Sequence, residues 1–461
     1  MLASIFDQFV QISPVTVMAR GLMERIFAAD RMDKLFATHA KVQYQRDLLF
    51  SSQVDLMSLV VCGIQKSVNA AYKAKAVELS VSTTALYNKL NGVETEVSQA
   101  LVRETAQELQ QIVQTIGGEQ PNPCPGYEMR IVDGNCLAGT DHRLDAIRLF
   151  AAKALPGKML VVLDPISKLV VDIFPIEDGH AQERSRFKEV LAVVKPNQIW
   201  TGDRNFCTAD FLTTIAERSA FFVIRQHGSL GWKEVSELKA AGQTDTGDIF
   251  EQKIEICYQG KPLRCRRIVV KLFKPTRDKD SEIAILTNLS PLVADTAHVT
   301  HLYRDRWSVE TLFQTVTENF NGEIQTLAYP KAALFSLAMA FATYNILATI
   351  RAALGSVHGV GKIEAGLSDY YLVDEVQGIY RGMMISIPEP HWQVFETLSI
   401  GQMGAVLQHL AHHVHLRRFL KATRGEKKKR PPLIVNSHHR HVSTARLLST
   451  HQTLMTSGVQ I

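Results

Sequence analysis

Two aspartates end short runs of residues that are typical of β-strands. Asp133 ends Arg-Ile-Val-Asp and is followed by Gly134, and Asp203 ends Ile-Trp-Thr-Gly-Asp and is followed by Arg204. Carboxylates that project from strand ends suit Mg²⁺, which binds one or two protein carboxylates and keeps other positions for water and phosphate. Aspartates are also common in turns, so each of the two has a structural alternative.

A third candidate group lies on a segment predicted to be one helix, from about residue 295 to residue 319. Tyr303, Arg306 and Glu310 recur along it, and at about 100° per residue they share one narrow face. A hydroxyl, a guanidinium and a carboxylate on one face can hold a phosphate and complete a metal site. The alternative is an intrahelical Arg–Glu pair beside a packed tyrosine, which would contribute roughly a few tenths of a kcal/mol.

The segment before residue 118 is predicted to be helical. Residues 68–78 and 82–92 form two short helices around a tight turn, which is the pattern of a helix-turn-helix. On the second helix, Thr83, Thr84 and Lys89 are expected to be exposed and to contact DNA. A helical hairpin that binds no nucleic acid has the same pattern.

From residue 127 the hydrophobic period changes to that of strands. The expected elements are strands at 129–133, 158–164 and 168–174, a helix at 178–194, a strand at 198–203 and a helix at 208–218. This order is that of a ribonuclease-H-like core. A second β-rich block at about 220–290 is expected as an insertion before the helix that carries Glu310.

Basic residues are concentrated near the C-terminus. Between Arg417 and Arg446 the chain has ten Lys or Arg residues and one Glu, whereas the net charge of the whole chain is only +5. The densest cluster consists of Lys427, Lys428, Lys429 and Arg430. Such an arm is expected to contact a polyphosphate, although a tail that only keeps the chain soluble has the same composition.

The composition excludes several classes of protein. Six scattered cysteines, with no Cys-x-x-Cys pair, predict neither a disulfide framework nor a structural zinc site, so we expect buried, reduced thiols. Asp7 interrupts the apolar start, and no signal peptide is expected. The apolar segment 333–350 contains several polar residues, which favours a buried helix over a membrane span and a soluble protein.

Two weaker signals concern histidines and one tryptophan. His409, His412, His413 and His415 have a spacing that could bind a metal, but without an acidic or cysteine partner an exposed histidine-rich surface is expected. Trp232 lies in the β-rich block and could stack on a displaced base. A place in the hydrophobic core is the commoner fate of tryptophan.

The three candidate blocks together resemble a known family. The segment YRDRWSVETLF, with Tyr303, Arg306 and Glu310, resembles the Tyr-(2)-Arg-(3)-Glu-(6)-Lys signature of DDE insertion-sequence transposases of the IS-four family. The segments IVDGNCLAGTDHRL around Asp133 and GDRNFC around Asp203 resemble the two blocks that carry that family's first two catalytic aspartates. The blocks occur in the family's order, and the resemblance covers nearly the whole chain.

The resemblance implies a metal-dependent DNA transposase. Asp133, Asp203 and Glu310 would be the catalytic residues and would hold two Mg²⁺ ions, for which Mn²⁺ can substitute, about 3.5–4 Å apart. The enzyme would bind terminal inverted repeats, cleave the element ends and join them to target DNA. Tyr303 and Arg306 would position the DNA backbone and would not be metal ligands.

The resemblance also implies the partners and the organisation of the chain. The partners are double-stranded DNA and a second copy of the chain in a synaptic complex, without a membrane, in the cytoplasm at the nucleoid. Residues 1–120 would be a helical DNA-binding domain, residues 127–345 the catalytic domain with its β-insertion, and residues 346–461 a helical region with a basic tail. The fold class is α/β.

One position departs from the family pattern, and two other functions remain open. Thr317 stands where the signature has a lysine, on the same predicted helix face as Glu310. The main alternative is a ribonuclease-H-like DNA nuclease that cuts without strand transfer, because the same three acids would serve both reactions. The second is an inactivated transposase that acts as a DNA-binding regulator; the loss of the lysine favours it, and the retention of all three acids argues against it.

Overall fold

The computed structural model describes residues 2–42, 48–77, 79–141, 143–144, 148, 154–276 and 279–422. Its contacts divide the chain into a compact unit, Met1–Leu420, and a second unit, Lys421–Ile461. The basic cluster Lys427–Arg430 lies outside the described residues. The expected three domains therefore stay a proposal, and the following description concerns the first unit.

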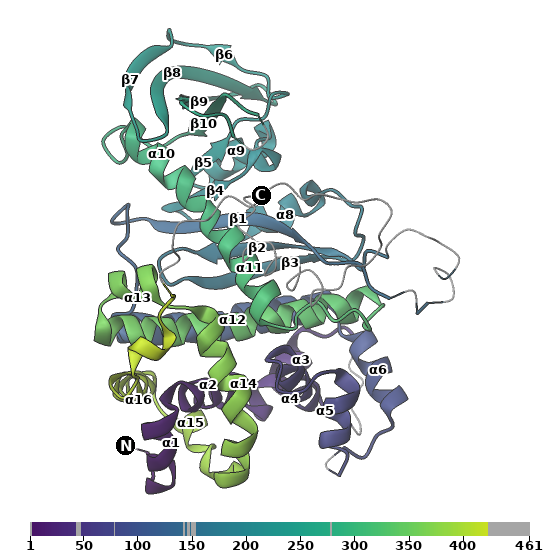
Figure 1. Cartoon of the computed structure of the whole chain (residues 1–461). Coiled ribbons are helices and arrows are strands. Elements are labelled where there is room, and N and C mark those ends of the chain that lie inside the picture. Colours follow the sequence, from purple (N-terminus) through teal and green to yellow (C-terminus); the bar gives the residue numbers. More distant parts are fainter. Residues whose placement is uncertain are drawn as a thin grey trace, which may run out of the picture. The chain divides into compact units, whose positions relative to one another are not determined.

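Helices build the N-terminal part of this unit (Figure 1). Two short helices, α5 and α6, lie where the helix-turn-helix is predicted, but α5 ends at Ala74 instead of residue 78, so residues 75–82 separate them and the connection is longer than the predicted tight turn. The Ser82 side chain caps α6 by accepting a hydrogen bond from the Ala85 N–H at 3.2 Å. The long amphipathic helix α7 follows. In order, the elements are η1 (Ser4–Phe6), α1 (Asp7–Ile12), α2 (Pro14–Ile26), α3 (Ala29–His39), α4 (Phe50–Val61), α5 (Val68–Ala74), α6 (Thr83–Gly92) and α7 (Thr95–Thr115).

A mixed sheet with the order β3-β2-β1-β4-β5-β10-β9-β8-β6 forms the centre of the unit, with β7 beside β8. Strands β1, β2 and β3 are antiparallel, whereas β4 is parallel to β1 and β5 is parallel to β4. The strands are β1 (Glu128–Cys136), β2 (Lys158–Asp164), β3 (Leu169–Ile176), β4 (Gln198–Gly202), β5 (Phe221–Arg225), β6 (Lys233–Glu234), β7 (Lys239–Gln243), β8 (Gly247–Tyr258), β9 (Lys261–Leu272) and β10 (Glu282–Thr287).

The β-rich block at 220–290 belongs to the same sheet as β1 to β4. Its first strand, β5, pairs with β4, and its last strand, β10, pairs with β5. The three central residues of β5, Phe222, Val223 and Ile224, are all buried, so this strand needs neighbours on both edges and cover on both faces. The block therefore continues the core sheet.

Side chains alternate between two apolar layers on either side of the sheet. In β2, Met159 and Val161 pack with the helical core that contains α7 and α12 (Pro330–His358), whereas Leu160 and Val162 pack on the opposite face. That face is covered by α8 (Phe187–Ala192) and α9 (Ala209–Glu217). The expected helix at 178–194 is shorter than predicted and consists of η3 (Glu183–Arg186) followed by α8.

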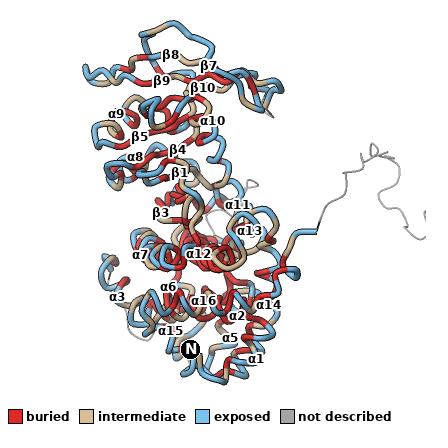
Figure 2. Tube along the Cα trace, turned by 90° about the vertical axis from the view of Figure 1, so that its left-hand side faces the viewer, coloured by how far each residue is buried: buried red, intermediate tan, exposed pale blue. Residues whose placement is uncertain are grey.

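Helix α12 has the length and apolar composition of a membrane span, but 94% of its most apolar window is buried inside the protein. Figure 2 shows it as a buried element in the middle of the unit. Its polar residue Asn345 bonds edge strand β3: Val170 N–H donates to Asn345 Oδ1, and Asn345 Nδ2 donates to the Val170 carbonyl, both at 2.8 Å. Burial against protein thus accounts for the apolar composition of α12.

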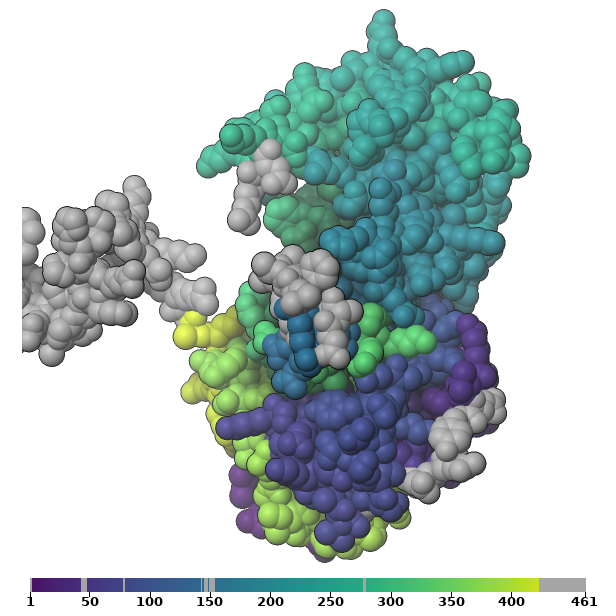
Figure 3. All heavy atoms as spheres, turned by 90° about the vertical axis from the view of Figure 1, so that its right-hand side faces the viewer, coloured from purple at the N-terminus to yellow at the C-terminus, as the bar shows by residue number. Residues whose placement is uncertain are grey.

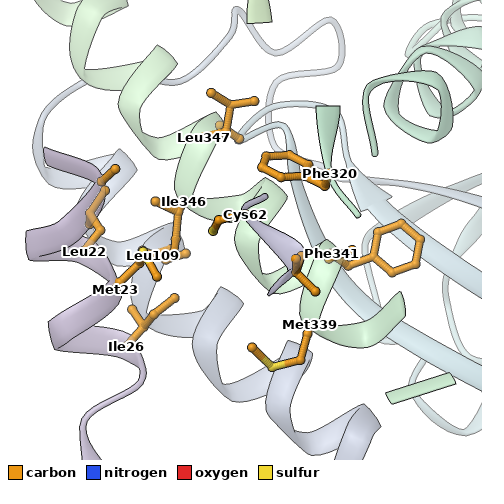
Figure 4. Close-up of a cluster of buried hydrophobic side chains, with 14 of the residues drawn as sticks. Leu22, Met23, Ile26, Cys62, Leu109, Phe320, Met339, Phe341, Ile346 and Leu347 are labelled. Carbon is orange, nitrogen blue, oxygen red and sulfur yellow. The ribbon is translucent and has the colours of Figure 1, made fainter. Parts of the chain in front are cut away.

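The main apolar core joins segments that are far apart in the sequence (Figure 4). Leu22, Met23 and Ile26 of α2 meet Ile346 and Leu347 of α12 in it. Downstream of α12 follow α13 (Val360–Gly366), α14 (Asp369–Ser386), η6 (Glu389–His391), α15 (Val394–Thr397), α16 (Ile400–His412) and η7 (Leu416–Phe419). In Figure 3 the N-terminal helical segments, in purple to blue, and the strands of the β-insertion, in teal, lie at opposite ends of the unit.

The cysteines are all free, and four of the six are buried. Cys136 and Cys257 are exposed, so the expectation of buried thiols is wrong for these two. Both lie at strand positions whose side chains alternate away from the apolar layers, at the end of β1 and near the end of β8.

Candidate active site

The register of the central strands brings the two aspartates together. Strands β1 and β4 are parallel, and their last paired residues are Val132 and Gly202. Asp133 and Asp203 are each the next residue, so they lie side by side, and the charge of Asp203 acts on Asp133. Asp133 does not end its strand as predicted, because β1 continues to Cys136 in its pairing with β2.

Asp133 is a largely buried carboxylate with two hydrogen-bond donors. Its Oδ1 accepts from the Gly134 N–H at 2.9 Å, and its Oδ2 accepts from Arg306 Nη1 at 2.6 Å. Burial raises the pKa of Asp133 to about 6; the charge of Asp203 adds to this increase, while Arg306 opposes it. The raised pKa means that the ionised form of Asp133 destabilises the folded chain, because the positive charge of Arg306 does not fully offset the burial of the carboxylate.

Asp203 begins a short turn, η4 (Arg204–Phe206). Its Oδ1 accepts from the Asn205 N–H at 2.8 Å, which is the side-chain cap of this turn. Phe206 is fully buried among the aromatic residues of the layer under β4. The buried ring and the cap together fix the backbone from which the Asp203 carboxylate projects.

Arg306 bonds both Asp133 and Glu310, two acids from different parts of the chain. Besides its bond to Asp133, it donates from Nη2 to Glu310 Oε1 at 2.9 Å, and its guanidinium lies 5.9 Å from the centre of the Tyr303 ring. Burial disfavours the charge of Arg306, but Asp133, Tyr303 and Glu310 raise its pKa above the ordinary value. Arg306 therefore stays charged at the centre of the group.

The segment that carries these residues is not the single helix expected. It consists of α10 (Thr296–Arg304), the 3₁₀ turn η5 (Asp305–Trp307) and α11 (Ser308–Asn319). Arg306 lies in this turn, and from it the guanidinium bonds Asp133 of β1. Tyr303 and Arg306 are only 7% and 9% exposed, and burial raises the pKa of Tyr303.

Glu310 lies in the first turn of α11, which packs across β1 (Figure 1). Its side chain is 55% exposed, so it can turn toward a ligand at little cost. Thr317, at the position of the family lysine, is exposed on the same helix. Arg306 thus links Asp133 to Glu310, and Asp203 follows the strand beside Asp133. That the three acids act together stays a prediction.

Sequence reasoning missed one acidic residue at this site, Glu183 in η3. Its Oε2 accepts from Asn205 Nδ2 at 3.4 Å, next to the Asp203 turn. Burial raises the pKa of Glu183, and the charge of Asp203 raises it further. The only sequence signal is an acidic residue near the start of the helix after β3, which is too common to single out.

The donor set fits a hard divalent cation in part. Asp133 and Asp203 offer adjacent carboxylates, the ligands that Mg²⁺ prefers. Within the part of the chain that the structure describes, no three acidic, histidine or cysteine side chains lie close enough to hold an ion. The Arg306 guanidinium bonds one carboxylate oxygen of Asp133 and one of Glu310.

The remaining predicted residues lie elsewhere. Helix α6 packs on α12, on the side away from β1 (Figure 1), with Thr84 exposed and Thr83 and Lys89 half-buried. Arg418, the second cation of the basic stretch, belongs to the folded unit, where it pairs with Glu375 at 3.2 Å.

The two weaker signals also have a structural outcome. The rings of His409 and His413 lie 4.7 Å apart, and neither belongs to a group of potential metal ligands among the described residues. Trp232 is 37% exposed and lies under the guanidinium of Arg267 at 5.2 Å. It is therefore not a core residue.

Comparisons with known proteins agree with this geometry. Residues 125–346 match the family model described as "Transposase DDE domain". The chain is 28% identical over 169 residues to the "Putative transposase y4zB" of Sinorhizobium fredii (strain NBRC 101917 / NGR234), in an alignment that covers 35% of this chain and 44% of that protein. The chain therefore spans less than half the length of this curated relative.

A solved structure with a similar course of the chain is described as "Cryo-EM structure of piggyBac transposase synaptic complex with hairpin DNA (SNHP)". The TM-score is 0.40 at 13% sequence identity, over 83% of this chain and 84% of that chain. The family match includes Asp133, Asp203, Tyr303, Arg306 and Glu310. Residues 125–346 of this chain thus form a transposase DDE domain.

Proposed function

We propose that this chain is a DNA transposase that binds terminal inverted repeats, cleaves the element ends and joins them to target DNA. The observation that carries the proposal is the register of β1 and β4, which aligns Asp133 with Asp203 inside a transposase DDE domain. Arg306 then connects this pair to Glu310. We assign the domain to the IS-four family on its Tyr-Arg-Glu signature.

The strand order supports a ribonuclease-H-like core. Three antiparallel strands, β3, β2 and β1, are followed by β4 and β5, which run parallel to β1. The helical segments η3 and α8 come between β3 and β4, and α9 comes between β4 and β5. In this proposal β6 to β9 are the insertion, and they shape the surface beside the DNA end.

Asp133, Asp203 and Glu310 are the residues that would hold the divalent cation. When bound, the cation lowers the pKa of an attacking water or hydroxyl and stabilises the leaving oxygen of a phosphodiester. In the first step a water oxygen bonds the scissile phosphorus, and the bond from that phosphorus to the 3′ oxygen breaks. In the second step the freed 3′-hydroxyl attacks a target phosphodiester, so one such bond forms as another breaks.

Arg306 and Tyr303 position the DNA backbone in this proposal. The guanidinium of Arg306 is charged, buried and forked, which suits two oxygens of one phosphate once it leaves a carboxylate. Helix α6 recognises the terminal repeats, and the basic tail adds contacts to phosphates. The enzyme acts as a homodimer at the bacterial nucleoid, with Mg²⁺ or Mn²⁺.

Cleavage of DNA that carries the element's own ends tests the proposal. The full chain is incubated with this DNA in Mg²⁺, in Mn²⁺ and in EDTA, and a scrambled end serves as the control. Metal-dependent cuts at the element boundary are expected. Cutting of both DNAs alike, or cutting in EDTA, would overturn the proposal.

A second assay separates the main alternative, a nuclease without strand transfer. An end with a free 3′-hydroxyl is supplied already cut, together with a supercoiled plasmid. Joined products are expected from a transposase, whereas a nuclease degrades the end without joining it. Specific binding with neither cleavage nor joining would favour the inactivated regulator.

A further inference from the structure

The Glu183 carboxylate lies where a side chain at position 134 would be, next to Asp133. A Cβ built on Gly134 would overlap the Glu183 carboxylate, and its three nearest heavy atoms are all in that carboxylate. The backbone of Gly134 is not in the left-handed region, so the glycine is not required by its φ angle. The Glu183 carboxylate therefore lies against the backbone of β1 at Gly134, and a side chain at position 134 would displace it.

The same segment also fixes the turn that carries Asp203. Glu183 accepts from the side chain of Asn205, and the neighbouring Arg184 donates from Nε to the Asn205 carbonyl at 3.1 Å. The Asn205 N–H in turn donates to Asp203. Three groups of one asparagine thus connect η3 to the Asp203 carboxylate.

The surface around Glu183 is a pocket of about 360 Å³ that also contains cations. The cations are Lys158 and Arg184, and the pocket is also lined by His227 and Asn205. Since Asn205 belongs to the Asp203 turn, the pocket adjoins the paired aspartates. Lys158 and Arg184 can bind the phosphates of a DNA strand, whereas the Glu183 carboxylate lies near Asp133 and Asp203.

We propose that Glu183 is a positioning residue of the cation site: it fixes the Asp203 turn through Asn205 and adds a third negative charge beside Asp133 and Asp203. The inference rests on the proposed function, because it assumes that the two aspartates hold a divalent cation. Residues behind the direct ligands that orient them typically change metal affinity about 10- to 100-fold when mutated.

Binding of Mn²⁺ to the full chain without DNA tests the inference directly. Electron paramagnetic resonance counts free Mn²⁺ during a titration of wild type, Glu183→Gln, Asp203→Asn and Glu189→Gln. Glu189 is the matched control, because it lies on the same helical segment and pairs with Arg186 at 3.0 Å, away from the aspartates. Glu183→Gln should weaken Mn²⁺ binding about tenfold or more, with Glu189→Gln unchanged.

The unfolding temperature in EDTA separates positioning from simple structural support. Glu183→Gln keeps the size of the side chain and removes a buried negative charge near Asp203, so the metal-free protein should be at least as stable as wild type. A purely structural Glu183 would give the opposite pair of results, a lower unfolding temperature and unchanged Mn²⁺ affinity. That pair would overturn the inference.

A second variant, Gly134→Ala, changes the position of the Glu183 carboxylate instead of its charge. Gly134→Ala forces the Glu183 side chain away without changing its charge, so it should weaken Mn²⁺ binding as Glu183→Gln does. In the Glu183→Ala background the added methyl group has nothing to displace, and its effect should largely disappear. Equal effects of Gly134→Ala in both backgrounds would contradict the proposed contact.

The outcomes distinguish this inference from the proposed function. If Mn²⁺ binding depends on Glu183 but the chain cuts no element end, the transposase proposal fails and the inference stands. If the chain cuts ends but Glu183→Gln binds Mn²⁺ like wild type, the inference fails and the proposal stands. A wild-type chain that binds no Mn²⁺ would overturn the inference.

Discussion

Arg306 donates a 2.6 Å hydrogen bond to Asp133, although the two residues are 173 positions apart in the sequence. The contact joins the turn between α10 and α11 to the central strand β1. Since Arg306 also bonds Glu310, one guanidinium neutralises two of the three proposed catalytic acids. A bound metal cation would compete with Arg306 for the two carboxylates. A DNA phosphate would compete with the carboxylates for the Arg306 guanidinium.

The pKa of Asp133 predicts how stability depends on pH in EDTA. Its pKa is about 6 in the folded chain and 3.8 in an unfolded one, so between these values the folded state binds more protons. Stability should therefore fall as pH rises from about 4 to above 6, by about 2–3 kcal/mol from this group. Asp133→Asn, which mimics the neutral acid, should unfold at a higher temperature than wild type at pH 8 and at the same temperature at pH 4. A constant difference across this range would contradict the assignment.

Loss of Arg306 should move that pH dependence upward. Arg306 opposes the rise in the pKa of Asp133, so Arg306→Gln should raise this pKa above about 6. Two pairs of proteins are compared: wild type with Asp133→Asn, and Arg306→Gln with the Arg306→Gln/Asp133→Asn double variant. The unfolding temperatures of the second pair should begin to differ at a higher pH than those of the first pair. Arg304→Gln is the matched control, because Arg304 pairs with the exposed Asp245 at 3.0 Å. The same shift in this control would mean that the effect is not local.

Replacement of each proposed catalytic acid by its amide removes charge but keeps size. Asp133→Asn, Asp203→Asn and Glu310→Gln should each abolish Mg²⁺-dependent cleavage, because an amide oxygen is a weaker ligand for a hard cation. Binding to the terminal repeats, measured by gel shift, should stay within about twofold of wild type because it is expected at α6. Glu318→Gln is the control, because Glu318 lies on the same helix as Glu310 and accepts a hydrogen bond from Gln314 at 2.7 Å. Near-normal cleavage by any of the three amide variants would show that its acid is misassigned.

The strands and the candidate acids could be predicted from the sequence, because their signals are local. The runs before Asp133 and Asp203 have strand composition, and the length of β2 agrees with the prediction at both ends. The break at Asp305–Trp307 had no such signal, since it contains neither glycine nor proline. Arg306 of this turn bonds Asp133, a tertiary contact that is not visible in the local sequence.

Three further features could not be predicted for the same reason. The strand that contains Phe222 has the same composition whether it continues the core sheet or starts a new one, and only its pairing with β4 decides. In the sequence, Asn345 is one of several polar residues in an apolar segment, whereas in the structure it bonds the edge strand β3. The approach of Glu183 to Gly134 likewise depends on the packing of η3 on the sheet.

The basic tail should contribute to DNA binding without regard to sequence. Deletion of residues 423–461 removes seven Lys or Arg residues and leaves the folded unit, including the ion pair of Arg418 with Glu375, intact. The slope of log K against log salt should flatten by about 0.9 for each phosphate that the tail no longer neutralises. Replacement of Lys427, Lys428, Lys429 and Arg430 by glutamine in the full chain should reproduce part of this change. An unchanged slope in both variants would identify the tail as a solubilising segment.

Thr317 offers a test of whether this chain lacks a cation that its family signature places against the DNA backbone. The residue is exposed on α11, seven positions after Glu310, so a lysine there points to the same side of the helix. Thr317→Lys should tighten binding of the DNA end or speed cleavage by an amount within the roughly 1.5–3 kcal/mol of a charge-assisted hydrogen bond, and the gain should shrink at high salt. Thr311→Lys places the same charge on another face of α11 and should have a smaller effect. If neither binding nor cleavage improves at either of two salt concentrations, position 317 does not face a DNA phosphate, and another segment supplies the cation.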